Sequence, residues 1–523
     1  MRSLLSIGAS FLTARTARKL SDGAGAVPAQ NRAFSRLCGQ LAHTAYGRTY
    51  AVAPDTAYAR FQACVPLQTY EGFLPFIERM KAGEANVLWP GHCNFYALTS
   101  GATTGQPKYL PVTDTLLEHF RKAAIDSLLY YTARVGHTGV LRGKHLVLGG
   151  AAPLTRLDES SSVEAYAGDL SSITTLNLPG WAEKHLYEPG APVARIADWP
   201  TKIQAIAERT WNRDITLLAG MPGGVLQLAE AIKTRAASGK SRPSHLQGVW
   251  PNLECFVHGG IPIAPYIDEL RACIGPKVNF HEVYTASEGF IAAQDDESAL
   301  GLRLMADSGL FFEFLPLTYY HEAHLPQLGQ HTVPLEGVQA GVNYALVIST
   351  PGGLTRYVMG DIVRFVSTTP HRLLCVGRLG QQLNAFSEHL IEKDLTDALV
   401  TVCQRHSWTI VNFHVAPLFT EGTRRGRHEW WVELKPLTSA TPTGPVIATE
   451  LDAELKRLNA DYAARRAVGD IDDPHVKLVM PGIFEHWLRA REKWGGENKV
   501  TRCRSDRQIA DELAQIARFS SEA

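Results

Sequence analysis

Hydrophobic residues recur along this chain at helical and strand periods, and the two periods alternate over most of its length. Residues 114–131 carry apolar positions at helical spacing, with Asp114 in place to cap the helix. Short apolar runs typical of buried strands occupy residues 145–148, 253–257, 277–284 and 344–349. Helical stretches at 225–237 and 265–273 separate several of these strands. This alternation predicts an α/β fold in which sheets lie buried between layers of helices.

The pattern changes near residues 377–382, where glycines bracket a short polar segment that is typical of a hinge. Beyond it the chain alternates again, with helices predicted at 388–403 and 449–466 and strands at 411–415, 430–434 and 477–479. A last helix begins near Ser505, which has Gln508 three residues on as in a capping box. We therefore expect a large multi-layer α/β domain over residues 1–378 and a smaller, mobile α+β lid domain over residues 379–523.

The first twenty residues contain four basic residues, several large apolar residues and no acidic residue. This composition fits an amphipathic first helix that packs on the large domain. It also fits an organelle transit peptide, which has the same basic and acid-poor character. We favour the helix, and the sequence by itself leaves the transit peptide open.

The overall composition is that of a soluble globular protein, because 45% of the residues are hydrophobic and 20% are charged. Lysine plus arginine and aspartate plus glutamate both number 52, so no bulk charge attracts a nucleic acid or a membrane surface. The eight cysteines include no C-x-x-C pair, which fits reduced thiols in the cytoplasm better than a disulfide framework or a zinc site. We expect a cytoplasmic protein with small-molecule partners, and the sequence gives no indication of its oligomeric state.

Glycine and hydroxyl residues are concentrated in the segment 99–111, which contains a single lysine. Gly101 and Gly105 allow backbone N–H groups to turn toward an anion. Four side chains of the segment add further donors: Ser100, Thr103, Thr104 and Lys108. The segment is not a Walker loop, because Gln106 and Pro107 separate the second glycine from the lysine. It predicts a loop that holds a polyphosphate, with a polar surface turn as the alternative.

Two acidic residues stand beside strand-like runs further along the chain. Glu288 follows the run 277–284 within the polar stretch Thr285–Gly289, where a carboxylate can face a metal–phosphate complex from the carboxyl edge of a sheet. Asp361 precedes the apolar run 362–366, where its carboxylate can accept both hydroxyls of a ribose. Each acid taken alone is also typical of a structural turn.

Taken together, these segments resemble the adenylate-forming superfamily of acyl-CoA synthetases, luciferases and peptide-synthetase adenylation domains. The closer resemblance is to the auxin-responsive family of acyl-acid amido synthetases and its bacterial members. That family has motifs of the types S-S-G-T-[TS]-x-G-x-x-K, Y-x-S-S-E, Y-R-x-G-D and Q-Y-K-x-P-R-C. The matching segments of this chain are, in the same order, Thr99–Lys108, Tyr284–Glu288, Arg356–Asp361 and Glu497–Cys503. The order and approximate spacing of the motifs hold from about Gln30 to Ile509.

Three features depart from the motifs of that family. Ala102 breaks the usual Gly-Thr pair of the first motif, which removes one donor from the loop. Arg356 precedes Tyr357, and the third motif is then longer by one residue. Thr501 stands where the family has proline. None of these changes removes a charged group that the chemistry needs, so we expect the same kind of activity.

The resemblance implies an ATP-dependent ligase that uses Mg²⁺. Such an enzyme activates a carboxylic acid as its acyl-adenylate and then transfers the acyl group to the amine of an amino acid, giving an amide, AMP and pyrophosphate. Residues 1–378 would bind ATP and the acyl acid. Two alternatives stay open: a ligase that uses a thiol such as coenzyme A after the same first step, and a nucleotide-binding relative without catalysis. The acid, the acceptor and the general base for amide formation are not indicated.

The resemblance also implies roles for single residues. Lys499 would swing in from the small domain to stabilise charge during adenylation, together with Lys108 of the loop, and Glu288 would bind the metal. Tyr284 would lie against the adenine. His258 and Gly259 are candidates for the substrate pocket. The residues expected to contact the nucleotide are Ser100, Gly101, Thr103, Thr104, Gly105, Tyr284, Thr285, Ser287, Asp361 and Arg378.

Overall fold

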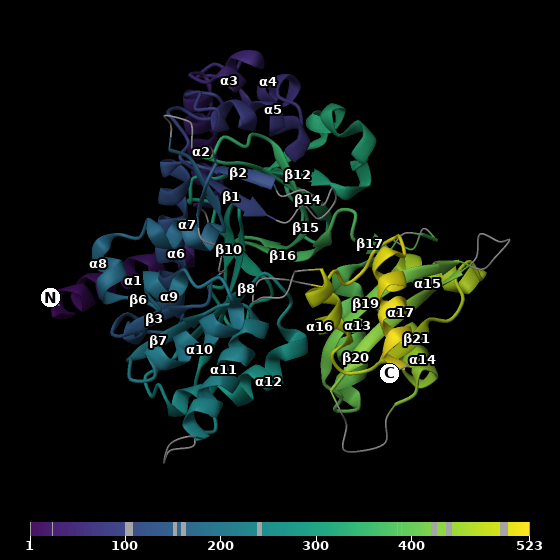
Figure 1. Ribbon diagram of the computed structural model, residues 1–523. Helices are drawn as coiled ribbons and strands as arrows, with labels where there is room; N and C mark the ends of the chain where they lie inside the picture. The colour runs from purple at the N-terminus through teal and green to yellow at the C-terminus, as the bar shows by residue number, and fades with distance from the viewer. Residues whose placement is uncertain are drawn as a thin grey trace. The chain divides into compact units, whose positions relative to one another are not determined.

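The computed structural model divides the chain into two compact units (Figure 1). The larger unit holds Met1–Ile261, Glu269–Met359 and Val363–Cys375, and the smaller unit holds Pro262–Asp268, Gly360–Ile362 and Val376–Ala523. The structure describes residues 2–22, 25–99, 108–149, 154–157, 164–237, 243–383, 385–386, 388, 390–419, 426–435, 442–491 and 500–521. Both units combine helices with sheets, which confirms the predicted mixed α/β fold.

A twelve-stranded sheet forms the centre of the larger unit. In spatial order its strands are β13 (Val333–Pro334), β12 (Phe311–Pro316), β14 (Asn343–Ser349), β15 (Tyr357–Thr368), β16 (His371–Arg378), β11 (Leu302–Leu304), β10 (Gly289–Ala293), β9 (Asn279–Ala286), β8 (Cys255–Gly259), β7 (Ile215–Ala219), β3 (Lys144–Val147) and β6 (Tyr187–Glu188). Strands β3, β7, β8 and β9 run parallel, so their carboxyl ends meet at one edge of the sheet. The strands predicted at 145–148, 253–257, 277–284 and 344–349 are β3, β8, β9 and β14, displaced by one or two residues.

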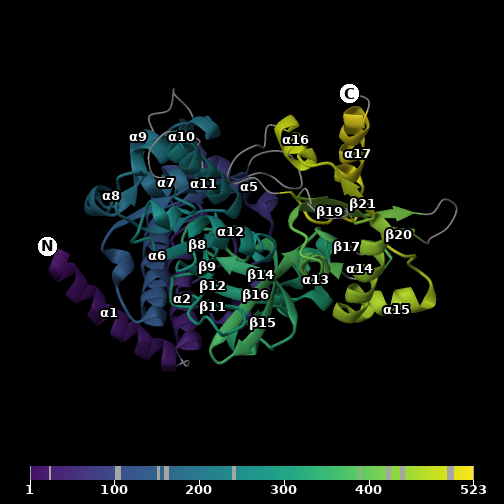
Figure 2. The same cartoon turned by 90° about the horizontal axis from the view of Figure 1, so that it is seen from below.

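A second sheet of the larger unit has four strands, in the order β2 (Lys108–Val112), β1 (Phe95–Thr99), β5 (Tyr166–Gly168) and β4 (Thr155–Arg156). The helices around the two sheets are α1 (Arg2–Asp22), α2 (Ala26–Leu41), α3 (Ala45–Thr49), α4 (Tyr58–Cys64), α5 (Tyr70–Lys81), α6 (Asp114–Val135), α7 (Leu170–Leu176), α8 (Gly180–His185), α9 (Ala191–Ala194), α10 (Trp199–Thr210), α11 (Pro222–Ala237) and α12 (Ile267–Ile274). Helices α10 and α11 lie side by side in both views (Figures 1 and 2).

The long helix predicted from residue 114 is α6, but its cap is not Asp114. The side chain of Thr113 accepts the hydrogen bond from the backbone N–H of Leu116 at 3.2 Å, and Asp114 occupies the first helical turn. Both residue types can cap, and here the one that has extended backbone takes the position. Helix α1 packs on α6, where the hydroxyls of Thr13 and Thr132 are 2.9 Å apart.

The smaller unit is built on the three-stranded sheet β19 (Ile410–Phe419), β20 (Gly426–Leu434) and β21 (His475–Val479). Its other elements are β17 (Gln382–Leu383), β18 (Leu390–Ile391), α13 (Glu392–Arg405), α14 (Gly444–Leu458), α15 (Ala460–Val468), α16 (Ile483–Ala490) and α17 (Gln508–Ser521). The single helix predicted at 449–466 is wrong. Asn459 has extended backbone and caps α15 through the N–H of Tyr462, so the segment forms two helices.

The predicted cap of the last helix is also wrong. The Ser505 hydroxyl donates to the Gln382 carbonyl oxygen at 2.5 Å and is therefore bound away from the helix. The neighbouring carboxylate of Asp506 accepts from the N–H of Gln508 at 3.1 Å instead. A carboxylate at a helix N-terminus also interacts favourably with the helix dipole.

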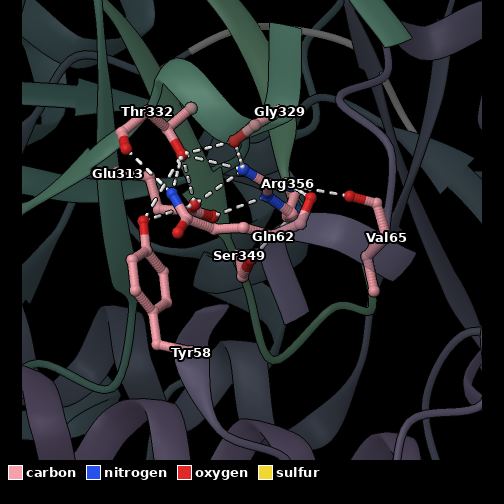
Figure 3. A network of polar contacts seen from close by, with 8 residues as sticks. All are labelled: Tyr58, Gln62, Val65, Glu313, Gly329, Thr332, Ser349 and Arg356. Atoms are coloured by element: carbon pink, nitrogen blue, oxygen red, sulfur yellow. Dashed lines mark hydrogen bonds and ion pairs between the residues drawn. The ribbon is translucent and has the colours of Figure 1, made fainter. Parts of the chain in front are cut away.

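A buried ion pair between Arg356 and Glu313 joins β12 to the segment that precedes β15 (Figure 3). Both side chains are at most 1% exposed. The guanidinium donates to the two carboxylate oxygens, from Nε at 3.1 Å and from Nη2 at 3.0 Å. Its other hydrogens go to the carbonyl oxygens of Gln62, Val65 and Gly329 and to the hydroxyl of Thr332. The charge is thus fully hydrogen-bonded, which a buried ion pair requires.

Helix α4 contributes to the same network. Tyr58 donates to Glu313 at 2.9 Å, and the side chain of Gln62 donates to the carbonyl oxygen of Thr332 at 2.8 Å. The backbone N–H of Arg356 donates to Ser349 Oγ at 2.9 Å, at the end of β14 (Figure 3). The network therefore ties three distant parts of the sequence into one rigid region.

Among the residues that the structure describes, no helix is both long enough and apolar enough to cross a membrane.

Replacing Glu313 with alanine should destabilise the larger unit by about 3–5 kcal/mol, because the guanidinium of Arg356 stays buried without its carboxylate. The free energy of unfolding, measured by urea titration with tryptophan fluorescence, gives this difference. Glu84→Ala is the matched control, since it breaks an exposed ion pair with Arg79 and should leave the free energy of unfolding almost unchanged. Similar losses in the two variants would contradict a structural role for the buried pair.

Candidate active site

Strands β8 and β9 end side by side at the carboxyl edge of the parallel part of the sheet. Gly259 pairs with Val283 at the end of this ladder. A Cβ atom at Gly259 would lie 2.2 Å from the Val283 carbonyl oxygen, so only glycine permits this close approach. The residues His258 and Gly259, predicted for the substrate pocket, therefore lie directly beside the strand that carries Tyr284.

A tight hairpin joins β9 to β10 at this edge. Ala286 pairs with Gly289, so that Ser287 and Glu288 form the turn. Both turn side chains are half-buried and Thr285 is exposed. A Cβ atom at Gly289 would lie 2.6 Å from a side-chain carbon of Leu310, so a larger residue there would require the Leu310 side chain to shift. Ser287 and Glu288, a predicted nucleotide ligand and the predicted metal ligand, thus share one turn.

Tyr284 lies in β9, three residues before Ser287, and it is only 9% exposed. It belongs to the main hydrophobic core of the larger unit. The stacking of its ring against an adenine stays a prediction.

His258 has a buried and neutral imidazole. It is 4% exposed, and burial lowers its pKa to about 4. The rings of Phe256 and Phe280 pack around it with centroids 5.4 and 5.8 Å away. Its Nδ1 atom has no hydrogen-bond partner among the described residues. Near pH 7 the ring can therefore offer either a donor or an acceptor to a ligand at the strand end.

His119 of α6 holds the hairpin from beneath, and nothing in the sequence motifs pointed to it. The backbone N–H of Phe290 donates to His119 Nε2 at 2.8 Å. Nδ1 therefore carries the ring proton and donates to the Ser308 carbonyl oxygen, also at 2.8 Å. The residue is 3% exposed, and burial lowers its pKa to about 4, so the ring is neutral near pH 7. Phe290 comes two residues after Glu288, and its anchoring fixes that turn.

A second polar contact lies further along the same face of α6. Ser127 Oγ is 2.9 Å from His281 Nε2, and both residues are buried. Burial lowers the pKa of His281 to about 3. In the sequence, His119 and Ser127 are visible only as polar residues at positions of α6 where the helical pattern predicts apolar ones. Such a position does not show which residue the side chain contacts.

Lys108 is the one residue of the predicted phosphate loop that the structure describes. It opens β2 and pairs with Thr99 at the end of β1, so the loop is the connection between these two strands. Its Nζ lies 5.4 Å from the ring centroid of Tyr70. Ser100, Gly101, Thr103, Thr104 and Gly105 lie outside the described residues.

Within the smaller unit, Asp361 and Arg378 form an ion pair. Arg378 Nε donates to Asp361 Oδ1 at 2.8 Å, with the carboxylate side chain 9% exposed and the guanidinium side chain 48% exposed. The backbone supports this contact, because the N–H of Leu379 donates to the Gly360 carbonyl oxygen at 2.6 Å. The two residues predicted to contact a ribose are therefore neighbours. Asp361 lies within β15, where we had expected it to precede the strand.

Lys499 also lies outside the described residues, but the segment that follows it is anchored. Arg502 donates to Asn412 of β19 and, at 3.0 Å, to the hydroxyl of Tyr266. Cys503 donates to the Gln381 carbonyl oxygen at 3.2 Å. These contacts fix the segment that contains Arg502 and Cys503.

The carboxylate of Glu288 suits a hard cation such as Mg²⁺. No group of three or more histidine, cysteine, aspartate or glutamate side chains that could enclose a metal ion occurs among the described residues. Mg²⁺ commonly binds through one or two carboxylates, with substrate phosphates and water as the other ligands. A single, half-buried carboxylate in the turn fits that mode of binding.

Three domains of one family match this chain in order. The GH3 family N-terminal domain matches residues 21–156, the GH3 family central domain residues 303–378 and the GH3 family C-terminal domain residues 393–508. Jasmonoyl--L-amino acid synthetase GH3.5 of Oryza sativa subsp. japonica is 22% identical over 86% of each chain. Indole-3-acetic acid-amido synthetase GH3.15 of Arabidopsis thaliana is 25% identical over 93% of this chain and 91% of its own.

Solved structures show the same fold. The GH3.15 acyl acid amido synthetase in complex with 2,4-DB superimposes with a TM-score of 0.76 at 18% identity, covering 97% of this chain and 96% of its own. 2-Hydroxyisobutyryl-CoA ligase in complex with 2-HIB-AMP gives a TM-score of 0.55 at 14% identity, covering 97% and 91%. Since the three family domains together span more than half of the sequence in the family's order, the chain belongs to the GH3 family.

Proposed function

We propose that this GH3 protein is an ATP-dependent acyl-acid amido synthetase. The observation that carries the proposal is the hairpin at Ser287 and Glu288, which lies at the carboxyl edge of a parallel sheet in a chain with all three GH3 domains. Ligands of α/β sheets bind outside this edge. The relatives named above are amido synthetases, which supports the same reaction here.

In the first step a carboxylate oxygen of the acid attacks the α-phosphorus of ATP. A new P–O bond forms while the bond to the departing pyrophosphate breaks. Both reactants are anionic, so the enzyme must neutralise their repulsion and hold them in line. We assign the phosphates to the loop Ser100–Lys108, whose backbone N–H groups and hydroxyls would bind them. Glu288 would hold Mg²⁺, which supplies positive charge to the phosphate oxygens.

Further residues would contact the nucleoside. Asp361 would accept the ribose hydroxyls, and its ion pair with Arg378 supports this role because it holds the carboxylate in place. Tyr284 would lie against the adenine. Thr285 and Ser287 would donate to the phosphate or the base.

In the second step the amine of an amino acid attacks the acyl carbonyl of the adenylate. A C–N bond forms, the C–O bond to AMP breaks, and the nitrogen loses a proton. We assign the acyl pocket to the surroundings of His258 and Gly259. The proposal also places ATP and acid binding in residues 1–378, gives residues 379–523 the role of a mobile lid, and sets the enzyme in the cytoplasm.

One experiment separates amide formation from the two alternatives. The purified protein receives ATP, Mg²⁺ and a panel of carboxylic acids, and ATP–pyrophosphate exchange identifies the acids that are activated. Amino acids or coenzyme A are then added, and mass spectrometry identifies the product. An amide supports the proposal, whereas a thioester as the sole product favours the thiol ligase. If no acid supports exchange, the remaining hypothesis is a nucleotide-binding protein without catalysis.

Lys499→Ala should raise the activation free energy of adenylation by about 3–4 kcal/mol, because a charge-stabilising donor is lost from the transition state. The adenylation rate should therefore fall roughly 10²–10³-fold. ATP–pyrophosphate exchange measures this step directly. Lys393→Ala is the matched control, since Lys393 is a surface lysine of the same unit in an ion pair with Asp397. An exchange rate equal to that of the control would remove Lys499 from the mechanism.

His119→Ala should lower kcat for exchange by about 10–100-fold, because the turn that carries Glu288 loses its anchor and a misplaced ligand is costly. His119→Gln should recover most of the rate, since an amide can both accept from Phe290 and donate to Ser308. An equal loss in the two variants would show that the hydrogen bonds do not position the turn.

The same residue has an effect on stability that depends on pH. In the unfolded chain a histidine binds a proton near pH 6.5, whereas folded His119 binds one only near pH 4. The unfolded state therefore holds more protons between these values, and the protein loses stability as the pH falls from 6.5 to 4. His119→Gln should show a weaker loss over this range, measured by urea unfolding at each pH. The same slope in both proteins would contradict the buried, neutral imidazole.

A further inference from the structure

A cavity of about 290 Å³ lies in the larger unit, beyond the residues considered so far. Its lining residues come from helices α7, α9 and α10 and from the chain that leaves β3 and β6. Helix α9 lies beside α10 in both views (Figures 1 and 2). Its volume is close to the lower end of the range for small-molecule sites. It is therefore large enough for a small metabolite or for one end of a longer substrate.

The cavity shares the sheet edge with the hairpin of Glu288. The register places Val147 of β3 beside Ala219, Ala219 beside Val257, and Val257 beside His281. Val147 and Gly149, at the carboxyl end of β3, line the cavity. Since neighbouring strands are about 4.8 Å apart, the cavity lies about 10 Å along this edge from the end of β8 and about 14 Å from β9.

The wall of the cavity combines apolar side chains with hydrogen-bond donors. Val147, Leu154 and Leu176 are its large aliphatic residues. The donors are three hydroxyls on α7 and two cationic side chains from the region of α9 and α10, namely Ser171, Ser172, Thr175, Arg195 and Lys202. No aspartate or glutamate belongs to the described lining. This chemistry suits a ligand with an apolar body and an anionic end.

Lys202 brings a positive charge into the wall from the first turn of α10. Its residue is only 2% exposed. The ammonium donates to the carbonyl oxygens of Gly149 at 3.2 Å and Ala194 at 3.0 Å, which fixes it where the chain leaves β3 and α9. A buried ammonium held in this way raises the local potential for an anion.

Arg195 supplies the group that a ligand can reach. It is exposed and lines the cavity directly after α9. Among the described residues its guanidinium has no hydrogen-bond or ion-pair partner. A guanidinium binds a carboxylate through two parallel hydrogen bonds, which gives selectivity as well as affinity.

Distance decides which substrate can place a carboxylate there. The amine and the α-carboxylate of an amino acid share one carbon, so an acceptor attacking the adenylate keeps its α-carboxylate close to the reacting carbonyl. An acyl acid instead extends away from that carbonyl. Three bonds of an extended chain span about 3.5 Å, so about 10 Å corresponds to eight or nine bonds.

Resting on the proposed function, we propose that the enzyme selects acyl acids that carry a second carboxylate at their far end, bound by Arg195 in this cavity. The reacting carboxylate would lie near the ends of β8 and β9. The aliphatic residues of the cavity would contact the body of the substrate. A dicarboxylic acid of eight to ten carbons, or an aromatic acid of equal span, has the required length.

The test compares dicarboxylic and monocarboxylic acids of six, eight and ten carbons in ATP–pyrophosphate exchange. We expect KM for the dicarboxylic acid of eight or ten carbons to be at least tenfold below that of the monocarboxylic acid of equal length. Arg195→Gln should raise KM about tenfold for that dicarboxylic acid and less than twofold for the monocarboxylic acid. Arg195→Lys should retain part of the preference. Arg213→Gln, an exposed arginine outside the cavity lining, is the matched control.

The outcomes separate this inference from the proposed function. Equal KM values for the paired acids, or a preference that survives in Arg195→Gln, would overturn the inference while exchange itself upholds the adenylating activity. A preference for acidic side chains that appears only when amino acid acceptors are varied would assign the cavity to the acceptor and also overturn it. If no acid supports exchange, the proposed function is wrong, and the inference about dicarboxylic acids falls with it.

Discussion

The buried pair of Arg356 and Glu313 is the constraint on which the central part of the larger unit depends. Arg356 has a φ of 51°, a conformation that is uncommon for a residue with a side chain. Surrounding structure must therefore hold it, and its contacts with the chain around Gln62 and Val65 do so. The strand that starts at Tyr357 is fixed by this arrangement, and Asp361 lies within that strand, five positions after Arg356. A structural network of the core thus fixes the start of the strand that carries a predicted ribose ligand.

Helix α6 links the two segments that would face the phosphates. It begins at Asp114, directly after β2, the strand that follows the glycine and hydroxyl loop. Its inner face holds β10 through His119 and β9 through Ser127. A shift of this helix would therefore move the loop's exit and the hairpin of Glu288 together. The geometry of the phosphate-facing residues depends on one rigid element more than on either loop alone.

The sequence predicted several strands, among them β3, β8, β9 and β14, because local hydrophobic runs are visible in one dimension. The position of Glu288 just past the end of a strand was predictable for the same reason. His119 could not be found in this way, since its role comes from partners almost two hundred residues away. The caps were uncertain for another reason: Thr113 and Asp114 are both good capping residues, and only the backbone conformation selects one. Asn459 broke a predicted helix because its side chain competes for the backbone.

In the proposed enzyme, different parts of the sheet edge would recognise the acid and the nucleotide. The hairpin after β9 is held by α6, whereas the cavity after β3 is lined from α7, α9 and α10. The partners of His119 are Phe290 and Ser308, and neither of them lines the cavity. Substitutions in the cavity wall can therefore alter which acid is accepted without moving Glu288. If family members that activate different acids differ in the cavity near β3 and β6, these differences would leave the hairpin of Glu288 in place.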